Sequence, residues 1–259
     1  MSISVLTRAY SNDRSGANTQ ESVLTAAVVR TRGIKRLFSL PLPGDRRGAE
    51  AQPLIVPGVA LPGGRTRDLV LLATMANQVF AFDANDGSPV WERALGTPIT
   101  SSSQIDEHPI NDHWGILSTP VVDSAAGVIY ACAWVSPDGS PGHAQHWLHA
   151  LSIVDGHAVH PPLNLEGATY DPGHGLQAQR FASATRKQRA SLLLASGTCS
   201  SPSARSSRRT GTAGAGSSPA TQDHGRSRRR GRVRPRASAP GSGRPAPAQS
   251  PTATVLSIA

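Results

Sequence analysis

The fold of this chain is decided by a stretch that occurs twice. The first copy reads VFAFDANDGSPV (residues 79–90), and the second reads LHALSIVDGHAV (residues 148–159). The residues that are identical at an offset of 69 are Ala81 and Ala150, Asp86 and Asp155, Gly87 and Gly156, and Val90 and Val159. Repetition at a fixed spacing indicates one structural unit that buries its faces only by stacking on its neighbours.

Each copy predicts a strand, a turn and a second strand. Residues 78–82 form a short apolar or alternating run, which predicts a strand. The DANDG sequence (residues 83–87) then predicts a turn, because Asp and Asn side chains accept hydrogen bonds from nearby backbone and Gly tolerates a positive φ. Val90 and Trp91 begin the next extended segment.

Further strand signals precede and follow this stretch. They lie at residues 69–74, 119–122, 128–134 and 147–151. We find no run with a 3.6-residue period long enough for a helix. Residues 1–197 are therefore predicted to form an all-β domain.

The composition divides the chain at about Thr198. Residues 198–259 hold 11 Arg, no Lys and the single acidic residue Asp223, a net charge of +10. Residues 1–197 keep 15 basic and 16 acidic residues, so the basic character belongs to the C-terminal segment. That segment is rich in Arg, Pro, Ser and Gly and poor in large apolar residues, which predicts a disordered tail at residues 198–259.

The sequence shows no segment that would address the chain to a membrane. No apolar run approaches the length that spans a bilayer, and residues 1–10 lack the apolar core of a signal peptide. Cys132 and Cys199 fall in different parts of the chain and predict no disulfide framework.

Residues 81–91 resemble the repeat of pyrroloquinoline-quinone-type β-propellers, in which Ala, Asp, Gly and Trp recur at this spacing. Residues 12–18, 51–54 and 115–123 are also similar to bacterial proteins built on such repeats. The resemblance implies a partial quinoprotein-like propeller of about two blades over residues 1–197, in which Trp91 docks between adjacent blades. His160 takes the place of this Trp in the second copy, which puts that contact in doubt. The structural repeat residues that we expect are Ala81, Asp83, Asp86, Gly87, Trp91, Ala150, Asp155 and Gly156.

The C-terminal segment has a second interpretation as out-of-frame translation. In the neighbouring frame, the codons of residues 197–204 permit Asn-Val-Phe-Val-Ala-Phe-Gly, a strand. Those of residues 212–222 permit a segment whose Ala-x-Asp-Ala lies a further 69 residues beyond Ala150, and those of residues 249–258 permit another strand–turn–strand. We therefore favour a frameshift that truncates the propeller. The alternative is a genuine arginine-rich arm, which could bind nucleic acid through phosphates but lacks aromatic residues for stacking.

The resemblance also raises the question of a cofactor. A quinoprotein dehydrogenase would need pyrroloquinoline quinone and a Ca²⁺ ion held by oxygen ligands. An oxygen-rich cluster of this kind consists of Asp106, Glu107, Asn111 and Asp112. We favour the simpler interpretation of a solvated loop between blades, and we expect no cofactor in this chain.

Histidines, tryptophans and cysteines are the remaining candidates for metal binding, partner contact or core packing. Five histidines invite a metal site: His108, His113, His143, His146 and His149. On a strand His146 and His149 point to opposite faces, so we interpret these histidines as surface residues and predict no metal ligands. We expect Trp114, Trp134 and Trp147 to be core, with partner-facing aromatic surface as the alternative. Cys132 is expected to be a buried small apolar residue, whereas Cys199 would be without meaning if the frame is shifted.

Two functions of different class follow. The first is a non-catalytic binding or scaffold protein that contacts a protein partner through a propeller face. The second is the remnant of a quinone-dependent dehydrogenase, inactive in this chain. The resemblance implies a periplasmic or secreted location, although no signal peptide is present. Nucleic acid is not the expected partner.

Overall fold

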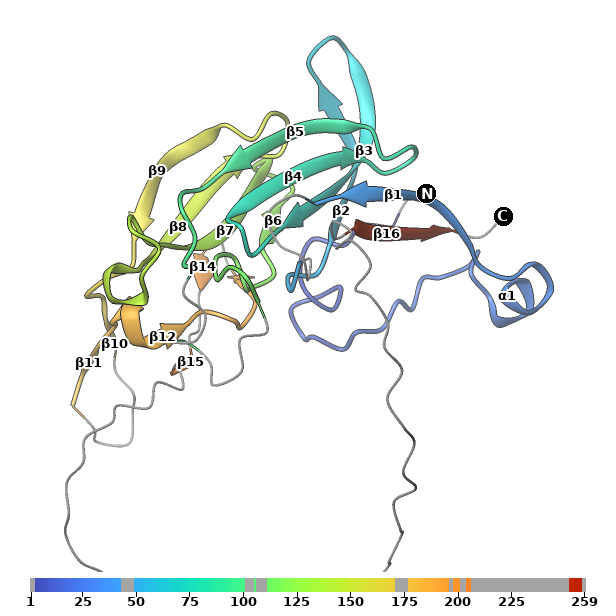
Figure 1. The fold of residues 1–259 in the computed structure, drawn as a ribbon. Helices are drawn as coiled ribbons and strands as arrows, with labels where there is room; N and C mark the ends of the chain where they lie inside the picture. The colour runs from blue at the N-terminus through green and yellow to red at the C-terminus, as the bar shows by residue number, and fades with distance from the viewer. Residues whose placement is uncertain are drawn as a thin grey trace, which may run out of the picture. The chain divides into compact units, whose positions relative to one another are not determined.

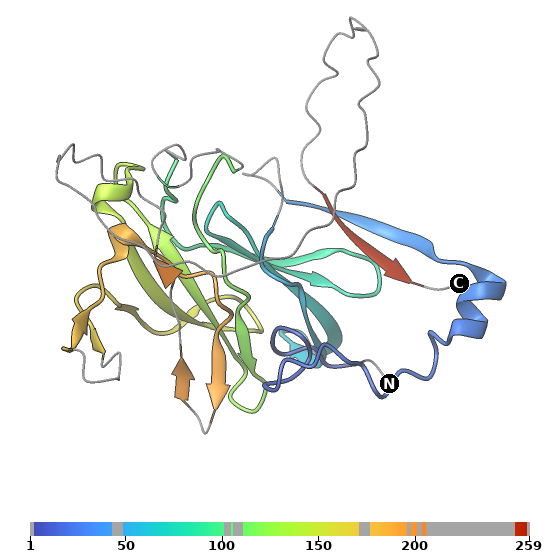
Figure 2. The same cartoon turned by 90° about the horizontal axis from the view of Figure 1, so that it is seen from below.

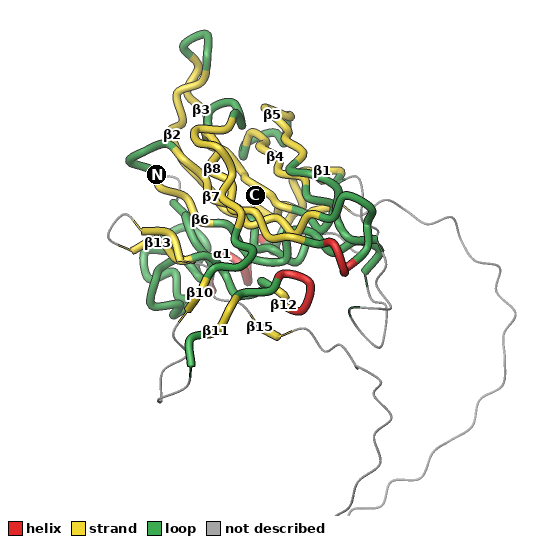
Figure 3. The backbone as a smooth tube through the Cα atoms, turned by 90° about the vertical axis from the view of Figure 1, so that its left-hand side faces the viewer, coloured by secondary structure: helices red, strands yellow, loops and turns green. Residues whose placement is uncertain are grey.

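The computed structural model describes residues 3–42, 49–100, 105, 111–170, 177–195, 198–200, 204–205 and 252–257. Strands dominate these residues, as Figure 3 shows, and the α-helical part is confined to α1 (Ala26–Arg32). The chain is therefore all-β, as the sequence predicts.

Two four-stranded antiparallel sheets form the body of the fold (Figure 1). Sheet A contains β2 (Leu54–Leu61), β3 (Arg65–Ala73), β4 (Gln78–Asp83) and β5 (Pro89–Ala94). Sheet B contains β6 (Val121–Asp123), β7 (Val128–Val135), β8 (Gln145–Ser152) and β9 (Ala158–Asn164). In both sheets the strands pair in chain order, so each sheet is a simple meander. Two successive meanders packed face to face are the arrangement of blades in a β-propeller.

The strands of sheet A bury both faces, with side chains alternating between two layers. Leu69 and Leu71 of β3 belong to one core cluster with Ile129 and Leu151 of sheet B. Val70 of β3, with other side chains of sheet A, faces the opposite way and packs in a second cluster against β1 (Lys35–Pro41). The alternation explains why β3 and β4 contain nearly continuous apolar runs: both faces are covered.

Sheet B is covered on both faces in the same way. Ile129, Ala131 and Ala133 of β7 face sheet A. Cys132, on the other face of β7, packs in a cluster with Val121 and with the fully buried Leu192. The next strand, β13 (Leu193–Ala195), follows Leu192 directly.

The last strand of sheet B differs from the rest of the sheet. Every residue of β9 is exposed, including Val159 at 43% and Leu163 at 59%. β5, which holds the same position in sheet A, is half covered because it lies against sheet B. β9 is thus an open apolar edge among the described residues.

The remaining described elements are short. They are β10 (Thr169–Tyr170), β11 (Gln179–Arg180), β12 (Arg186–Lys187), β14 (Thr198–Ser200), β15 (Ala204–Arg205), β16 (Thr252–Ser257) and the 3-10 turns η2 (Pro141–His143) and η3 (Ser183–Thr185). β13 pairs with β14, β12 with β15 and β10 with β11. β16 pairs with β1, and the two strands lie side by side in Figures 1 and 2. Within the described ranges, no helix is long and apolar enough to cross a membrane.

Helix α1 was not expected from the sequence. It has only seven residues and buries none of them, so it carries no amphipathic period that a sequence pattern could reveal. Its local signal is the cap: the hydroxyl oxygen of Thr25 accepts a hydrogen bond from the backbone N–H of Val28 at 3.2 Å.

The predicted disordered tail falls mostly outside the described residues. Three short strands, β14, β15 and β16, are described within residues 198–259. The domain boundary at Gly197 stays a prediction.

Candidate inter-sheet docking site

The repeated stretch forms two turns with the same hydrogen bonds. In sheet A the backbone N–H of Asp83 donates to the carbonyl of Ser88, and the N–H of Gly87 donates back to the carbonyl of Asp83, both at 2.9 Å. In sheet B, Ser152 with His157 and Gly156 with Ser152 make the equivalent two bonds, again at 2.9 Å. The offset of 69 residues therefore relates the two turns bond by bond.

Side chains reinforce both turns in the same way. The carboxylate of Asp86 accepts from the N–H of Ser88 at 2.8 Å, and that of Asp155 accepts from the N–H of His157 at 3.1 Å. These bonds hold the pKa of each carboxyl below its ordinary value. Gly87 and Gly156 have φ values of 75° and 70°, the left-handed region that favours glycine.

One position keeps its role although its residue type changes. The carboxylate of Asp83 accepts from the N–H of Asn85 at 2.8 Å, and in the second turn the hydroxyl oxygen of Ser152 accepts from the N–H of Val154 at 3.2 Å. Asp83 also forms an ion pair with Arg67 at 2.6 Å. Asp83 is buried, so this ion pair replaces part of the solvation that the carboxylate loses.

Trp91 of β5 reaches across to the turn of sheet B. Its indole N–H donates to the carbonyl of Ile153 at 2.9 Å. Its ring lies against Gly156, where a Cβ atom would stand only 2.6 Å from a ring carbon. Gly156 thus has two reasons to be glycine, its positive φ and the ring that covers it.

Arg93 strengthens the same contact. Its guanidinium Nε–H donates to the carbonyl of Gly156 at 2.9 Å. Trp91 and Arg93 are two residues apart on β5, so their side chains leave the strand on one face. Together they clasp the turn of residues 153–156, and we call this contact the inter-sheet lock.

A second aromatic ring covers the equivalent glycine of sheet A. A Cβ atom at Gly87 would stand 2.7 Å from a ring carbon of Phe38 and 3.0 Å from a methyl carbon of Leu40, both on β1. β1 therefore contacts the turn of sheet A as β5 contacts the turn of sheet B. The sequence could not reveal this pairing, because β1 lies outside the repeated stretch.

The lock is not continued by the described residues beyond sheet B. His160 stands where the repeat places Trp, and it lies exposed on β9. The sequence already placed this inter-blade contact in doubt, because His replaces Trp here. Within the described chain, the imidazole of His160 has no neighbouring turn to contact.

The expected oxygen-rich cluster lies only partly within the described residues. Asp106 and Glu107 fall outside them, as does His108. Asn111 is buried, and its side-chain amide donates to the carboxylate of Glu50 at 3.1 Å. Among the described residues, no group of three or more His, Cys, Asp and Glu side chains is placed to hold a metal ion.

The histidines of β8 correct one expectation. His146 is not a surface residue: it is 1% exposed and stacks on Trp134, with ring centroids 5.0 Å apart. Burial lowers the pKa of His146 to about 3 and that of half-buried His149 to about 4. The two side chains take opposite faces, because His146 pairs with Trp134 and His149 with Ala131. The strand pattern was right, but it could not tell that both faces are covered.

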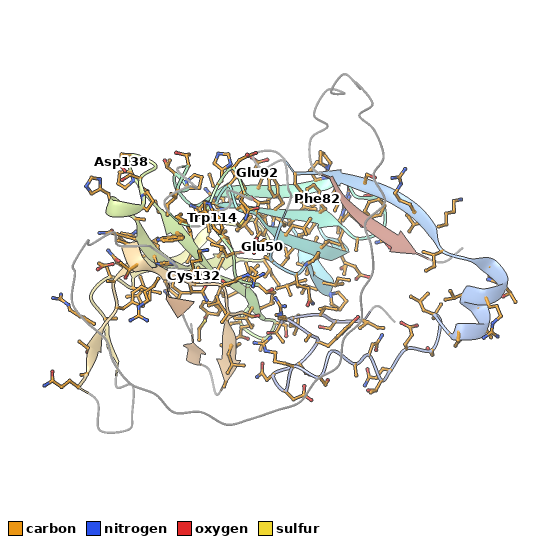
Figure 4. The ribbon with its side chains drawn as sticks, turned by 60° about the horizontal axis from the view of Figure 1, so that its bottom comes forward. Glu50, Phe82, Glu92, Trp114, Cys132 and Asp138 are labelled. Carbon is orange, nitrogen blue, oxygen red and sulfur yellow. The ribbon has the colours of Figure 1, made fainter. Side chains whose placement is uncertain are left out.

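The other histidines lie outside the core of sheet B. His143 is exposed and contacts the carboxylate of Asp138 at 2.6 Å. The pKa of Asp138 is lowered first by the backbone N–H of Ser140 and then by His143. His113 is half-buried. Asp138 lies well apart from Glu50 and Trp114 in Figure 4.

The tryptophans and cysteines largely follow the sequence. Trp114 and Trp134 are buried, and Trp147 is half-buried at a pocket of about 320 Å³. Cys132 is buried, as expected. Cys199 pairs with Leu194 in the β13–β14 hairpin, and burial raises the pKa of its thiol.

Comparison with known proteins identifies no family for this chain. No protein-family profile matches the chain, and no curated protein matches it in sequence. Among solved structures, the crystal structure of BamB from Moraxella catarrhalis matches 66% of this chain and 61% of its own, with 11% sequence identity and a TM-score of 0.20. The likeness thus spans less than two thirds of that chain, and at this score it bears on neither fold detail nor function.

Proposed function

We propose that this chain is part of a propeller of quinoprotein-like repeats that acts as a non-catalytic binding or scaffold protein. The observation that carries the proposal is the inter-sheet lock, in which Trp91 and Arg93 clasp the turn of residues 153–156. In a lock of this kind, the residues that recur in the repeat pack one sheet against the next. The repeat residues Asp86, Gly87 and Asp155 then have structural roles, and the loops remain for a protein partner.

A third sheet would continue the series beyond sheet B. The support is that Leu192 is fully buried against sheet B and that Leu194 packs in the same cluster. The codons of residues 197–204 permit a strand in the neighbouring frame, and β14 begins at Thr198 within that stretch. On this proposal the arginine-rich sequence results from a shifted reading frame, so its positive charge does not indicate a binding partner.

Two experiments test the proposal. Sequencing the gene across the codon of Gly197 checks the reading frame. A gene without blade-encoding sequence in the neighbouring frame would rule out the proposed third sheet. Titration of the frame-restored protein with pyrroloquinoline quinone and Ca²⁺ checks the function. We expect no saturable change in quinone absorbance and no alcohol-dependent dye reduction. Either signal would favour the alternative, a quinone-dependent dehydrogenase.

A further inference from the structure

A basic pocket lies between the chain segments that precede three strands, β2, β6 and β13. Glu50 shortly precedes β2, Leu117 precedes β6, and residues 189–191 precede β13. The N-terminal loop of residues 8–14 closes the fourth side. The pocket has a volume of about 900 Å³, near the upper end for ligand sites in proteins.

The charge of the pocket is positive and only partly compensated. Its lining includes Arg8, Arg14 and Arg189 against the single carboxylate of Glu50. Arg189 pairs with Glu50 at 3.3 Å, and the same carboxylate also accepts from Asn111. This acid is therefore already engaged, and the pocket keeps an excess of two positive charges.

Arg14 is held in place without an acidic partner among the described residues. Its guanidinium donates to the hydroxyl of Thr7 and the carbonyl of Arg8, both at 2.7 Å, and to the carbonyl of Leu192 at 2.9 Å. All three acceptors are neutral. Burial lowers the pKa of Arg14 first, and the nearby charge of Arg8 lowers it further, so the two cations repel each other.

The loop that carries these arginines is tightly folded. Ala9, Tyr10 and Arg14 have φ values of 56°, 70° and 57°, a region that residues other than glycine seldom adopt. Elsewhere among the described residues, Asn77 is the one other non-glycine residue with such a φ. Strained backbone of this kind clusters at ligand sites, where the surrounding structure holds it. The loop is anchored by the side chain of Gln52, which accepts from the N–H of Ala9 at 3.0 Å.

The chemistry of the lining selects the ligand. Guanidinium groups bind carboxylates through paired N–H donors. Leu117 and Leu193 add apolar wall between the charges. The volume exceeds what a simple anion fills, and the chain's own C-terminal segment is excluded because its net charge is also positive.

We infer that this pocket binds an acidic peptide segment of a partner protein, one in which carboxylate and apolar side chains alternate. The inference rests on the proposed scaffold function and names the chemistry of its partner. Arg8 is exposed and its charge acts on Arg14. Its guanidinium has no partner among the described residues, and it is the group that meets the first carboxylate.

Fluorescence anisotropy on the full chain tests the inference. The probe is a labelled peptide of alternating Glu and Leu, and its control is the peptide with Gln in place of Glu. We expect the acidic peptide to bind and the Gln peptide to bind at least about tenfold more weakly. Arg8→Glu should weaken binding of the acidic peptide by about tenfold, since attraction becomes repulsion. Arg8→Lys should weaken it less, because the charge remains while the fork is lost.

Arg65→Glu is the matched control. Arg65 is exposed at the tip of the β2–β3 hairpin, and its substitution changes the net charge by the same amount. An equal effect of Arg8→Glu and Arg65→Glu would overturn the inference, because binding would then follow overall charge or the arginine-rich segment. Displacement of the peptide by inorganic phosphate at a similar concentration would assign the pocket to free anions. Failure of peptide binding without a quinone signal refutes the pocket alone, whereas a quinone signal refutes the scaffold function.

Discussion

The inter-sheet lock makes a quantitative prediction at Gly156. Gly156→Ala adds a Cβ atom at a φ of 70° and at 2.6 Å from the ring of Trp91. The backbone strain should lower the free energy of unfolding by about 1 kcal/mol, and the displaced ring should lower it by about 1–3 kcal/mol more. Gly127→Ala is the matched control, because Gly127 has a φ of 67° and no atom within 4 Å of its Cβ position. It should show the strain alone.

A double-mutant cycle separates the two contributions. In the Trp91→Ala background the ring is gone, so Gly156→Ala should cost only the backbone strain of about 1 kcal/mol. Pulse proteolysis in urea measures the free energy of unfolding on small amounts of protein, which suits a chain with an open sheet edge. Equal costs for Gly156→Ala and Gly127→Ala, with no coupling to Trp91, would refute the lock.

Three further perturbations address the packing around it. His146 is buried in its neutral form, with a pKa of about 3 against an ordinary value near 6.5. Its contribution to the free energy of unfolding is complete above pH 6.5 and falls as the pH drops from there toward 3. Between pH 7 and pH 5 we expect His146 to account for a loss of about 2 kcal/mol in urea titrations. His149, with a pKa of about 4, adds a loss of its own, so His146→Phe should remove only the part due to His146. An unchanged pH profile in that variant would contradict this prediction. Phe38→Ala uncovers Gly87 and should lower the free energy of unfolding by about 2 kcal/mol. Leu37→Ala is the control: its side chain is 49% exposed, so the free energy of unfolding should change by less than about 0.5 kcal/mol. A similar loss for both variants would count against the packing of Phe38 on Gly87. We expect the chain to be poorly soluble alone because β9 is an open apolar edge. Leu163→Lys should raise the soluble monomer fraction in size-exclusion chromatography more than Val23→Lys does. A sharp two-state melt of the unaltered purified monomer would contradict this expectation.

Most of the fold could be read from the sequence because its signals are local. The Asp-Gly turns need particular residues to bond nearby backbone and adopt a positive φ, so Gly87 and Gly156 stand out at a fixed spacing. The short apolar runs of β4 and β7 likewise mark strands, and nearly every residue in them is buried. These features belong to short stretches of chain and need no knowledge of what lies beside them.

What escaped the sequence depends on contacts between distant residues. Nothing in the residues around Phe38 indicates that its ring covers Gly87, since β1 shares no pattern with β5. The strand spacing of His146 and His149 predicts that they take opposite faces, but it cannot show that both faces are covered. Trp134 stacks on His146, which is buried. The basic pocket was missed for the same reason, because Arg8, Arg14 and Arg189 come together only in the folded chain.

The central proposal is a third sheet that follows sheet B and packs on it as sheet B packs on sheet A. Hydrogen exchange measured by mass spectrometry, on the present chain and on the chain restored to the neighbouring frame after Gly197, tests this directly. Restoration of the frame should slow exchange in β6–β9, because the exposed edge strand β9 becomes covered, and should leave β2–β5 unchanged as an internal control. Equal exchange of β6–β9 in the two chains would contradict the account.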